Sequence, residues 1–285
     1  MRVAVVGHTE WIDFIRVPQM PGPGEIVHAL DAWDSPGGGG AVAAVQLAKL
    51  AGEGRFYTAL GDDDLGRRAC RELSLLGLEV YAGFRPEPQR RAVTYVVNSG
   101  ERSITVLGVR SSPSAQDPLP WPDLEGYDAV FVTAGDPQAV RLARRARVLV
   151  ATSRIIPLLS EAGVRLDALV GSRLDPSEQY ADGDLKVRPK LVVRTAGPAG
   201  GTFQPEGGPQ DSYRATSLPG PVVDTYGCGD SFAAGLTYAL GAGLEPRKAV
   251  EFAARCGAAV ATGKGPYPAQ LTRHDVEALG LLPNG

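Results

Sequence analysis

One short stretch, DTYGCGD at residues 224–230, brings two glycines and a carboxylate together. Gly227 and Gly229 allow a tight backbone turn in which successive N–H groups point into one small space, and such a space suits an anion. Apolar residues then recur at helical spacing over residues 232–240, so the turn should lead into a helix whose positive N-terminal end faces the same space. Asp230, at the start of that helix, is placed to accept a proton from a hydroxyl group that attacks a phosphoryl group.

Asp230 has a second interpretation, because Asp is an ordinary residue at the N-terminal cap of a helix. A glycine turn followed by an Asp cap would need no chemistry at all. Taken alone, the stretch therefore leaves a phosphoryl-transfer centre and a helix cap equally open. The rest of the chain must decide between them.

The stretch resembles the D-T-x-G-A-G-D signature of ribokinase-like (pfkB) carbohydrate kinases, and further stretches follow in that family's order along nearly the whole chain. The resemblance implies that Gly227, Cys228 and Gly229 form an anion hole for the transferred phosphate. It also implies that Asp230 is the base that activates the acceptor hydroxyl, and that Thr225 and the two glycines contact the nucleotide. Cys228 stands where the family usually has Ala, Gly or Ser, which changes the side chain and leaves the backbone N–H in place.

Length and composition allow one large or two ordinary domains with a substantial core, because the chain has 285 residues and is 44% hydrophobic. The 29 basic and 32 acidic residues are dispersed and give a net charge of −3, which argues against nucleic acid as a partner. Cys70, Cys228 and Cys256 lack the number and spacing of a disulfide framework or a zinc site. No apolar run approaches the ~20 residues that span a bilayer, so we expect a cytoplasmic protein without a membrane segment.

The elements that must position the 224–230 stretch alternate between short apolar runs and helical periodicities, which is typical of a mainly parallel sheet with helices on both faces. The chain opens on the β-branched run Val3–Val6. Further strands are predicted at 56–60, 129–132, 148–150, 168–170 and 191–193, with helices at 43–50, at 137–147 and from 245 onward. The family resemblance narrows this fold to a ribokinase-like three-layer α/β/α sandwich with a small β-sheet lid, a single kinase domain over residues 1–285.

A second glycine-rich stretch, SPGGGGAV at residues 35–42, precedes a helix with a small-residue face. A dinucleotide fingerprint would need these glycines directly after the first strand, which ends at Gly7, so we reject that interpretation. The stretch resembles the family's G-G-x-x-x-N motif, which implies that Gly38, Gly39 and Val42 line the sugar site. Val42 replaces the family's Asn, and Gly39 stands where ribokinases proper have Lys. The loss of both hydrogen-bonding side chains argues against ribose itself as the acceptor.

The loop RTAGPAGG at residues 194–201 follows a predicted strand. It resembles the family's T-x-G-x-x-G nucleotide loop, which implies contacts with ATP at Thr195, Gly197 and Gly200. Without the resemblance, the same residues would be interpreted as a plain β-turn between strands.

Two acidic residues are candidates for the substrate and the metal. Asp13 lies in the polar segment after the first strand, at the carboxyl end where open α/β sheets bind ligands; on the sequence alone, a solvated loop residue is the simpler interpretation. The resemblance implies a sugar-binding carboxylate near this point, because a carboxylate can accept several hydrogen bonds from a diol. Residues 171–175, GSRLD, resemble the N-x-x-E motif whose acid helps to hold Mg²⁺, with Asp175 in its place. By analogy, residues 262–265 would lie near the adenine and a site for a monovalent cation such as K⁺.

A separate small sheet is predicted from residues 25–33 and from a hairpin whose strands, 92–97 and 103–108, flank the turn NSGE. These strands fall in two lid segments, about 13–34 and 90–109. A lid of this kind excludes water from the reaction.

The lid strands carry apolar residues in alternation, Val93 with Tyr95 and Ile104 with Val106, and no helix in the sequence covers the outer face of their sheet. Two lids that pack across a two-fold axis would bury these residues. In family members that dimerise, the lid forms the interface. We therefore expect a lid-to-lid homodimer, with a monomer whose lid folds over its own substrate as the alternative.

The function expected from these observations is ATP-dependent phosphorylation of a hydroxyl group on a sugar or sugar-like molecule, with Mg²⁺ bridging phosphate oxygens and Asp230 as base. A nucleoside kinase or a sugar-phosphate kinase of the same fold is the nearest alternative. The changes at Val42, Ser172 and Asp175 also leave open a nucleotide- or sugar-binding protein that has lost turnover. The presence of Asp230 argues against that loss.

Overall fold

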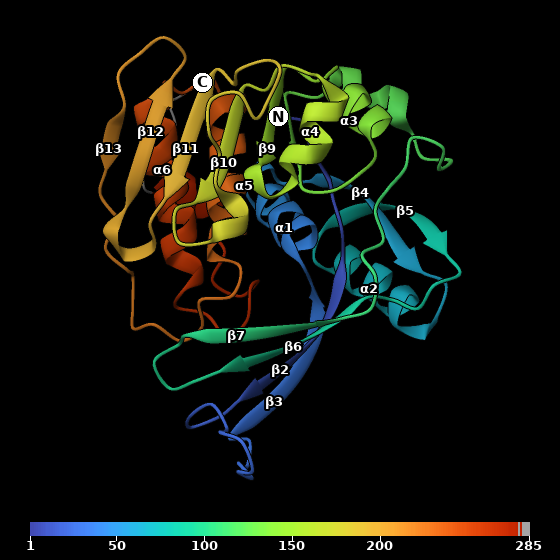
Figure 1. Ribbon diagram of the computed structural model, residues 1–285, viewed down its shortest axis with the longest axis vertical. Helices are drawn as coiled ribbons and strands as arrows, with labels where there is room; N and C mark the ends of the chain where they lie inside the picture. Colours follow the sequence, from blue (N-terminus) through green and yellow to red (C-terminus); the bar gives the residue numbers. More distant parts are fainter. Residues whose placement is uncertain (279, 281–285) are drawn as a thin grey trace.

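The computed structural model describes residues 1–278 and 280 and contains two separate β-sheets (Figure 1). The strands of the large sheet are β1 (Val3–Val6), β4 (Gly54–Gly61), β5 (Leu78–Arg85), β8 (Ala129–Val132), β9 (Val148–Thr152), β10 (Ala168–Ser172), β11 (Leu191–Thr195), β12 (Gly201–Pro205) and β13 (Asp211–Tyr213). The strands of the small sheet, the lid, are β2 (Glu10–Arg16), β3 (Asp31–Gly37), β6 (Arg91–Val96) and β7 (Arg102–Leu107). The helices are α1 (Gly39–Ala51), α2 (Asp64–Leu75), α3 (Pro137–Ala143), α4 (Ile156–Ala162), α5 (Cys228–Gly241), α6 (Pro246–Val260) and α7 (Arg273–Ala278).

The large sheet has the strand order β13-β12-β11-β10-β9-β8-β1-β4-β5, and its strands are parallel from β11 through β5. Only the edge strands β12 and β13 pair antiparallel. The predicted mainly parallel sheet is therefore confirmed. The short apolar runs at 3–6 and 129–132 form central strands with the predicted bounds, because both of their faces are covered and every position is apolar.

Helices cover both faces of the large sheet and divide the core in two. Val3 and Val5 of β1 belong to one cluster with α1, α5 and α6, whereas Ala4 and Val6 belong to another with α3 and α4. This division follows from the alternation of side chains along a strand. None of the described residues forms a helix that is long and apolar enough to cross a bilayer.

The lid has the strand order β3-β2-β6-β7 and projects from the edge of the main body where β1 ends (Figure 1). Its strands come from two distant parts of the chain, since β2 pairs antiparallel with β3 and parallel with β6. The strand predicted at 25–33 begins only at Asp31, and the polar segment expected after β1 is instead largely the lid strand β2. The strand β2 was missed because it carries apolar residues on both of its faces, so its period-two pattern is concealed.

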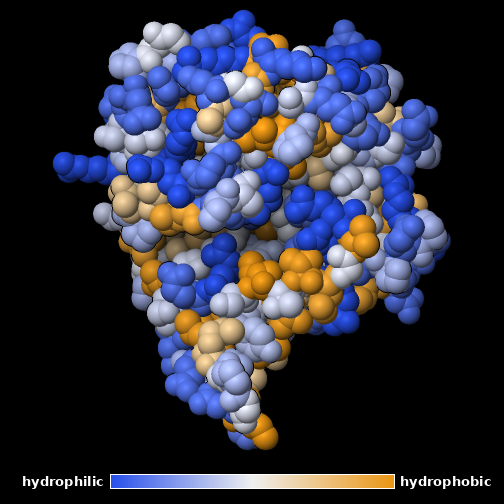
Figure 2. Space-filling view, in the orientation of Figure 1, coloured by the Kyte–Doolittle hydropathy of each residue, from blue (hydrophilic) through white to orange (hydrophobic). Residues whose placement is uncertain are grey.

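The register of the lid places its two apolar sets on opposite faces. Ile104 lies opposite Thr94 and Val106 lies opposite Ala92; Thr94 and Ala92 are buried on this face, whereas Ile104 and Val106 are exposed. Tyr95 pairs with Ser103 and lies on the outer face. Both faces of β7 are exposed, and Figure 2 shows apolar side chains at the surface where the lid meets the body. The outer face is thus less apolar than the sequence suggested.

Candidate active site

The site forms at the carboxyl edge of the parallel sheet, under the lid. His8 follows β1, Arg154 follows β9 and Glu178 follows β10, so the connections after three parallel strands bring polar side chains to one edge. This edge is where open α/β sheets bind their ligands. The turn at residues 224–230 and the start of α1 close the other side.

The 224–230 turn leads directly into α5, as the sequence predicts. Gly227 is the N-cap residue and has φ 83°, a left-handed conformation that glycine adopts without strain. The Ser231 N–H donates to the Gly227 carbonyl at 2.9 Å, whereas among the described residues no acceptor faces the N–H groups of Gly229 and Asp230. These free N–H groups and the positive end of a 14-residue helix make the turn suitable for an anion.

The Asp230 carboxylate lies directly beside the glycines at the start of α1. A β-carbon added to Gly39 would come within 2.8 Å of Asp230 Oδ1 and 3.8 Å of His8 Cε1. Two glycine-rich stretches that are far apart in the sequence therefore meet at one carboxylate. Burial, together with the nearby charge of Glu178, raises the pKa of Asp230 to about 6. At neutral pH the carboxylate is ionised and has unusual affinity for a proton.

Aromatic contacts hold the two glycine stretches together. The Gly38 N–H donates to the Tyr226 hydroxyl at 2.9 Å, and the Tyr226 ring meets Phe14 edge-on at 5.1 Å between ring centroids. Phe14 in turn stacks on Trp33 at 5.0 Å. Because Phe14 and Trp33 belong to the lid, the lid, the start of α1 and the 224–230 turn form one packed unit.

Two of the predicted sugar-binding residues lie elsewhere. Val42 is fully buried in the core, packed against Gly227, so its side chain does not line the cleft. Asp13 pairs with Arg91 at 2.6 Å on the face of β2 opposite to Ile12, which contacts Gly37 near Tyr226. Strand alternation therefore directs Asp13 away from Asp230.

Polar residues other than Asp13 lie where the sugar-binding carboxylate was expected, at the end of β1. Glu10 is buried, its carboxylate lies 2.8 Å from Arg90 Nε, and it lies 4.0 Å from His8 Nε2. Burial, together with the charges of Arg110, Arg90 and Arg154, lowers the pKa of His8 to about 3, so His8 is neutral. His8 and Glu10 could have been found as polar residues directly after a buried strand, whereas no local pattern marks Arg110.

The predicted metal ligand Asp175 caps a short 3-10 turn, Pro176–Glu178, by accepting from the Ser177 N–H at 2.9 Å. Its carboxylate also pairs with Arg154 at 2.5 Å, and Glu178 pairs with the same arginine at 2.6 Å. The charge of Glu178 raises the pKa of Asp230 more than that of Glu10, the other acid that acts on it. Among the described residues there is no group of three or more acidic, His or Cys side chains that could hold a metal ion by itself.

The predicted nucleotide loop lies next to these acids. Thr195 ends β11 and pairs with Ser172 of β10, whose N–H donates to Glu178 Oε2 at 2.8 Å. Gly200, with φ 82°, allows the close approach of Tyr213, since an added β-carbon would lie 2.1 Å from its carbonyl oxygen. Gly197 is also left-handed and lies at the surface.

The tip of the lid hairpin lies on the 224–230 turn. The Gly100 carbonyl accepts from the Thr225 N–H at 3.2 Å and from its hydroxyl at 3.1 Å. The Arg102 guanidinium donates at 2.9 Å to both the carbonyl and the hydroxyl of Thr225. Thr225 is therefore engaged by the lid in this structure.

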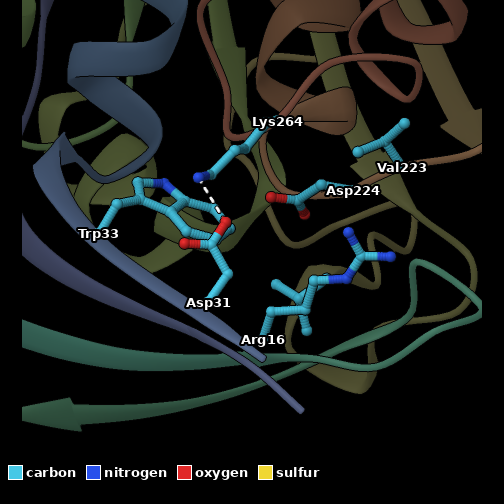
Figure 3. A pocket seen from close by; sticks show the side chains of 7 residues that line it. Arg16, Asp31, Trp33, Val223, Asp224 and Lys264 are labelled. Atoms are coloured by element: carbon cyan, nitrogen blue, oxygen red, sulfur yellow. Dashed lines mark hydrogen bonds and ion pairs between the residues drawn. The ribbon is translucent and has the colours of Figure 1, made fainter. Parts of the chain in front are cut away.

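A small pocket separates the lid from the main body beside this turn (Figure 3). Arg16, Asp31 and Trp33 line it from the lid, and Asp224 and Lys264 line it from the body. Lys264 pairs with Asp31 at 2.5 Å and lies 4.3 Å above the Trp33 ring. These contacts tie the lid to residues 262–265.

Comparison with known proteins identifies the family. The model of the pfkB family carbohydrate kinases matches residues 1–157 and 165–273. The chain belongs to the pfkB family of carbohydrate kinases. This pfkB kinase is thus a phosphotransferase with an alcohol group as acceptor, and the residues that match the family model include the turn that carries Asp230.

Individual relatives of this pfkB kinase differ in the acceptor that their names give. The ATP-dependent ribose-1-phosphate kinase of Halopiger xanaduensis is 27% identical over 281 residues, which cover 93% of each chain. The ribokinase of Arabidopsis thaliana is 24% identical over 96% of this chain and 79% of its own length. The structure of Arabidopsis thaliana ribokinase complexed with ribose and ATP superposes with a TM-score of 0.77 at 22% identity, covering 100% of this chain and 99% of the other. This likeness confirms the ribokinase-like fold with its lid.

Proposed function

We propose that this pfkB kinase transfers a phosphoryl group from ATP to a sugar hydroxyl that is deprotonated by Asp230. The observation that carries the proposal is the position of Asp230 Oδ1 against Gly39, at the first turn of two helices. A raised pKa of about 6 makes Asp230 a better proton acceptor than an ordinary carboxylate and leaves it ionised at neutral pH. Gly38 and Gly39 form the floor on which the sugar would lie.

The phosphates of ATP would bind at the turn. The N–H groups of Gly229 and Asp230 point to the place where charge develops on the transferred group, and the helix α5 adds its positive N-terminal end. Thr225 and the loop from Thr195 to Gly200 would contact the nucleotide. The names of the relatives support ATP as the donor.

The residues present fit the cations that the family implies. Mg²⁺ keeps waters and phosphate oxygens as ligands and needs only one or two carboxylates, which Glu178 would supply together with the predicted Asp175. When bound, Mg²⁺ neutralises charge on the phosphate oxygens. Asp224 is a buried carboxylate whose partners among the described residues are backbone N–H groups, those of Tyr226 at 2.8 Å and Gly265 at 3.2 Å, and it would suit a monovalent cation such as K⁺.

An assay of ATP consumption tests the function. The purified protein is offered a panel of free sugars, sugar phosphates and nucleosides, and the Asp230→Asn variant is assayed in parallel. We expect turnover with at least one sugar or sugar phosphate and its loss in the variant. Turnover restricted to nucleosides would replace the carbohydrate acceptor, and ATP binding without turnover of any acceptor would favour a binding protein.

A further inference from the structure

Two arginines lie at the base of the lid, on either side of the same hairpin. Arg90 directly precedes β6, and Arg110 follows β7 after Gly108 and Val109. The register pairs Arg91 with Leu107, so both arginines lie at the end of the hairpin that joins the main body. Gly108 has φ 84°, and a β-carbon there would lie 3.9 Å from Arg90 Cα, so the two segments lie in contact. The hairpin thus brings two guanidinium groups to one side of the cleft.

The arginines of the cleft differ in how far carboxylates neutralise their charge. Arg154 is held by two carboxylates, Asp175 and Glu178, and Arg90 pairs with Glu10. Arg110 is half-buried, and among the described residues its side chain has no hydrogen bond and no ion pair. Burial lowers the pKa of Arg110, and the positive charge of Arg90 lowers it further. A half-buried guanidinium that faces other cations is unfavourable unless an anion joins it.

The groups around Arg110 leave its charge uncancelled. His8 is buried, is neutral because of its low pKa, and has no partner for Nδ1. Glu10 is the one acid whose charge acts on Arg110, but burial raises the pKa of Glu10 and its carboxylate already pairs with Arg90. The cleft therefore has a cationic end at Arg90 and Arg110.

His8 links this cationic end to the proposed base. The imidazole lies against Gly38, where a β-carbon would be 3.2 Å from His8 Cδ2, and against Gly39 beside Asp230. A sugar lying on Gly38 and Gly39 would thus have one end at Asp230 and its other end toward the two arginines. The two ends of the cleft differ in chemistry: Asp230 at one end can accept a proton, and the arginines at the other end can bind an anion.

We propose that the acceptor is a sugar that already carries a phosphate group, and that Arg110 and Arg90 bind this phosphate at the end of the sugar opposite the reacting hydroxyl. The inference rests on the proposed function, because it places the sugar between Asp230 and the arginines. A dianionic phosphate offers several acceptor oxygens to two planar guanidinium groups and supplies the charge that Arg110 lacks. A sugar carboxylate would supply only one negative charge, and the experiment includes it as an outcome.

Kinetics with matched acceptors test the inference. Ribose, ribose 1-phosphate, ribose 5-phosphate, fructose, fructose 1-phosphate, fructose 6-phosphate and gluconate are compared with the wild type, Arg110→Gln and, as a control, Arg145→Gln, whose exposed arginine lies after α3. We expect kcat/KM to be at least ~100-fold higher for one sugar phosphate than for its free sugar. Arg110→Gln should raise the KM for that phosphate at least tenfold, whereas Arg145→Gln should leave it unchanged. Preference for a free sugar or for gluconate, or equal KM values in the two variants, would overturn the proposal.

Binding of inorganic phosphate separates this inference from the proposed function. The thermal midpoint Tm of each protein is measured with and without phosphate at constant ionic strength, in the absence of ATP and sugar. We expect phosphate to stabilise the wild type and Arg145→Gln more than it stabilises Arg110→Gln. An equal phosphate effect on all three proteins would refute the arginine site even if the kinase is active. If phosphate stabilises Arg110→Gln less than the other two proteins but the wild type turns over no acceptor, the arginine site is supported and the catalytic function is refuted.

Discussion

The Asp230 carboxylate lies so close to Gly39 that a β-carbon on Gly39 would come within 2.8 Å of Oδ1. Gly39 thus leaves the face of the carboxylate open toward the cleft, where a side chain would cover it. The backbone of Gly39 is that of an ordinary helix start, so the glycine is needed for space and not for its conformational freedom.

Gly39→Ala tests this relationship. Because the methyl group would displace or shield Asp230, we expect kcat to fall at least tenfold while the Tm changes little. Gly208→Ala is a matched control, since a β-carbon there meets only Pro205 at ordinary contact distance, 3.5 Å. Steady-state kinetics on both variants decide the point. Equal kcat values would show that the contact does not matter for turnover.

Asp230→Asn keeps the shape of the side chain and removes the base. We expect kcat to fall by at least ~10²-fold, while the Kd for ATP changes little because the backbone N–H groups of the turn remain. Turnover and nucleotide binding are measured on the same preparation. Near-normal turnover in the variant would show that Asp230 is only a helix cap.

The raised pKa of Asp230 predicts a pH profile. Since the base must be ionised, kcat/KM should rise with pH and level off above about pH 6. The same shift affects stability with the opposite sign: the folded protein holds this proton more tightly than the unfolded chain, whose pKa is near 3.8. As the pH rises from about 4 to about 6, the wild type should therefore lose stability relative to Asp230→Asn. Above that range the difference in Tm between the two proteins should stay constant.

Val42→Asn changes a core residue and not a residue of the cleft. The amide would be buried among apolar side chains beside Gly227, at a cost on the order of 1–3 kcal/mol in the free energy of unfolding. We expect a lower Tm and a lower kcat for every acceptor. A changed acceptor preference at unchanged Tm would instead show that residue 42 contacts the acceptor. Val42→Ile, which stays apolar, is the control for altered size.

Assembly through the lid stays a prediction. We propose that the outer face with Val93 and Tyr95 meets its copy in a homodimer, and that Tyr95→Glu weakens the dimer by burying a charge. Leu75→Glu introduces the same charge at an exposed position on α2, outside the lid, and should have no effect. Sedimentation velocity at micromolar concentration measures both variants. A monomeric wild type would refute the dimer.

Continuous apolar runs such as Val3–Val6 were predictable because burial on both faces demands apolar residues at every position. The direction of Asp13 was not predictable, since it depends on the register of β2 against β3 and β6, and a shift of one residue would reverse it. The role of Glu178 was equally hidden, because the turn at Pro176–Glu178 brings its carboxylate to Arg154 and to the Ser172 N–H at the end of β10. Arg110 follows the lid hairpin, and only the tertiary structure shows that its charge is unpaired.

The strand β3 ends at Gly37 and the helix α1 begins at Gly39, so a single residue, Gly38, joins the lid to the floor of the cleft. Gly38 is left-handed, with φ 84°, and its N–H is fixed by Tyr226. A tilt of the lid that moves β3 against α1 would therefore change the backbone of this glycine and displace the neighbouring Gly39, which faces Asp230. Opening the lid to release product would also shift Gly38 and Gly39, on which the next acceptor has to lie. Product release and acceptor binding would therefore depend on the same short segment.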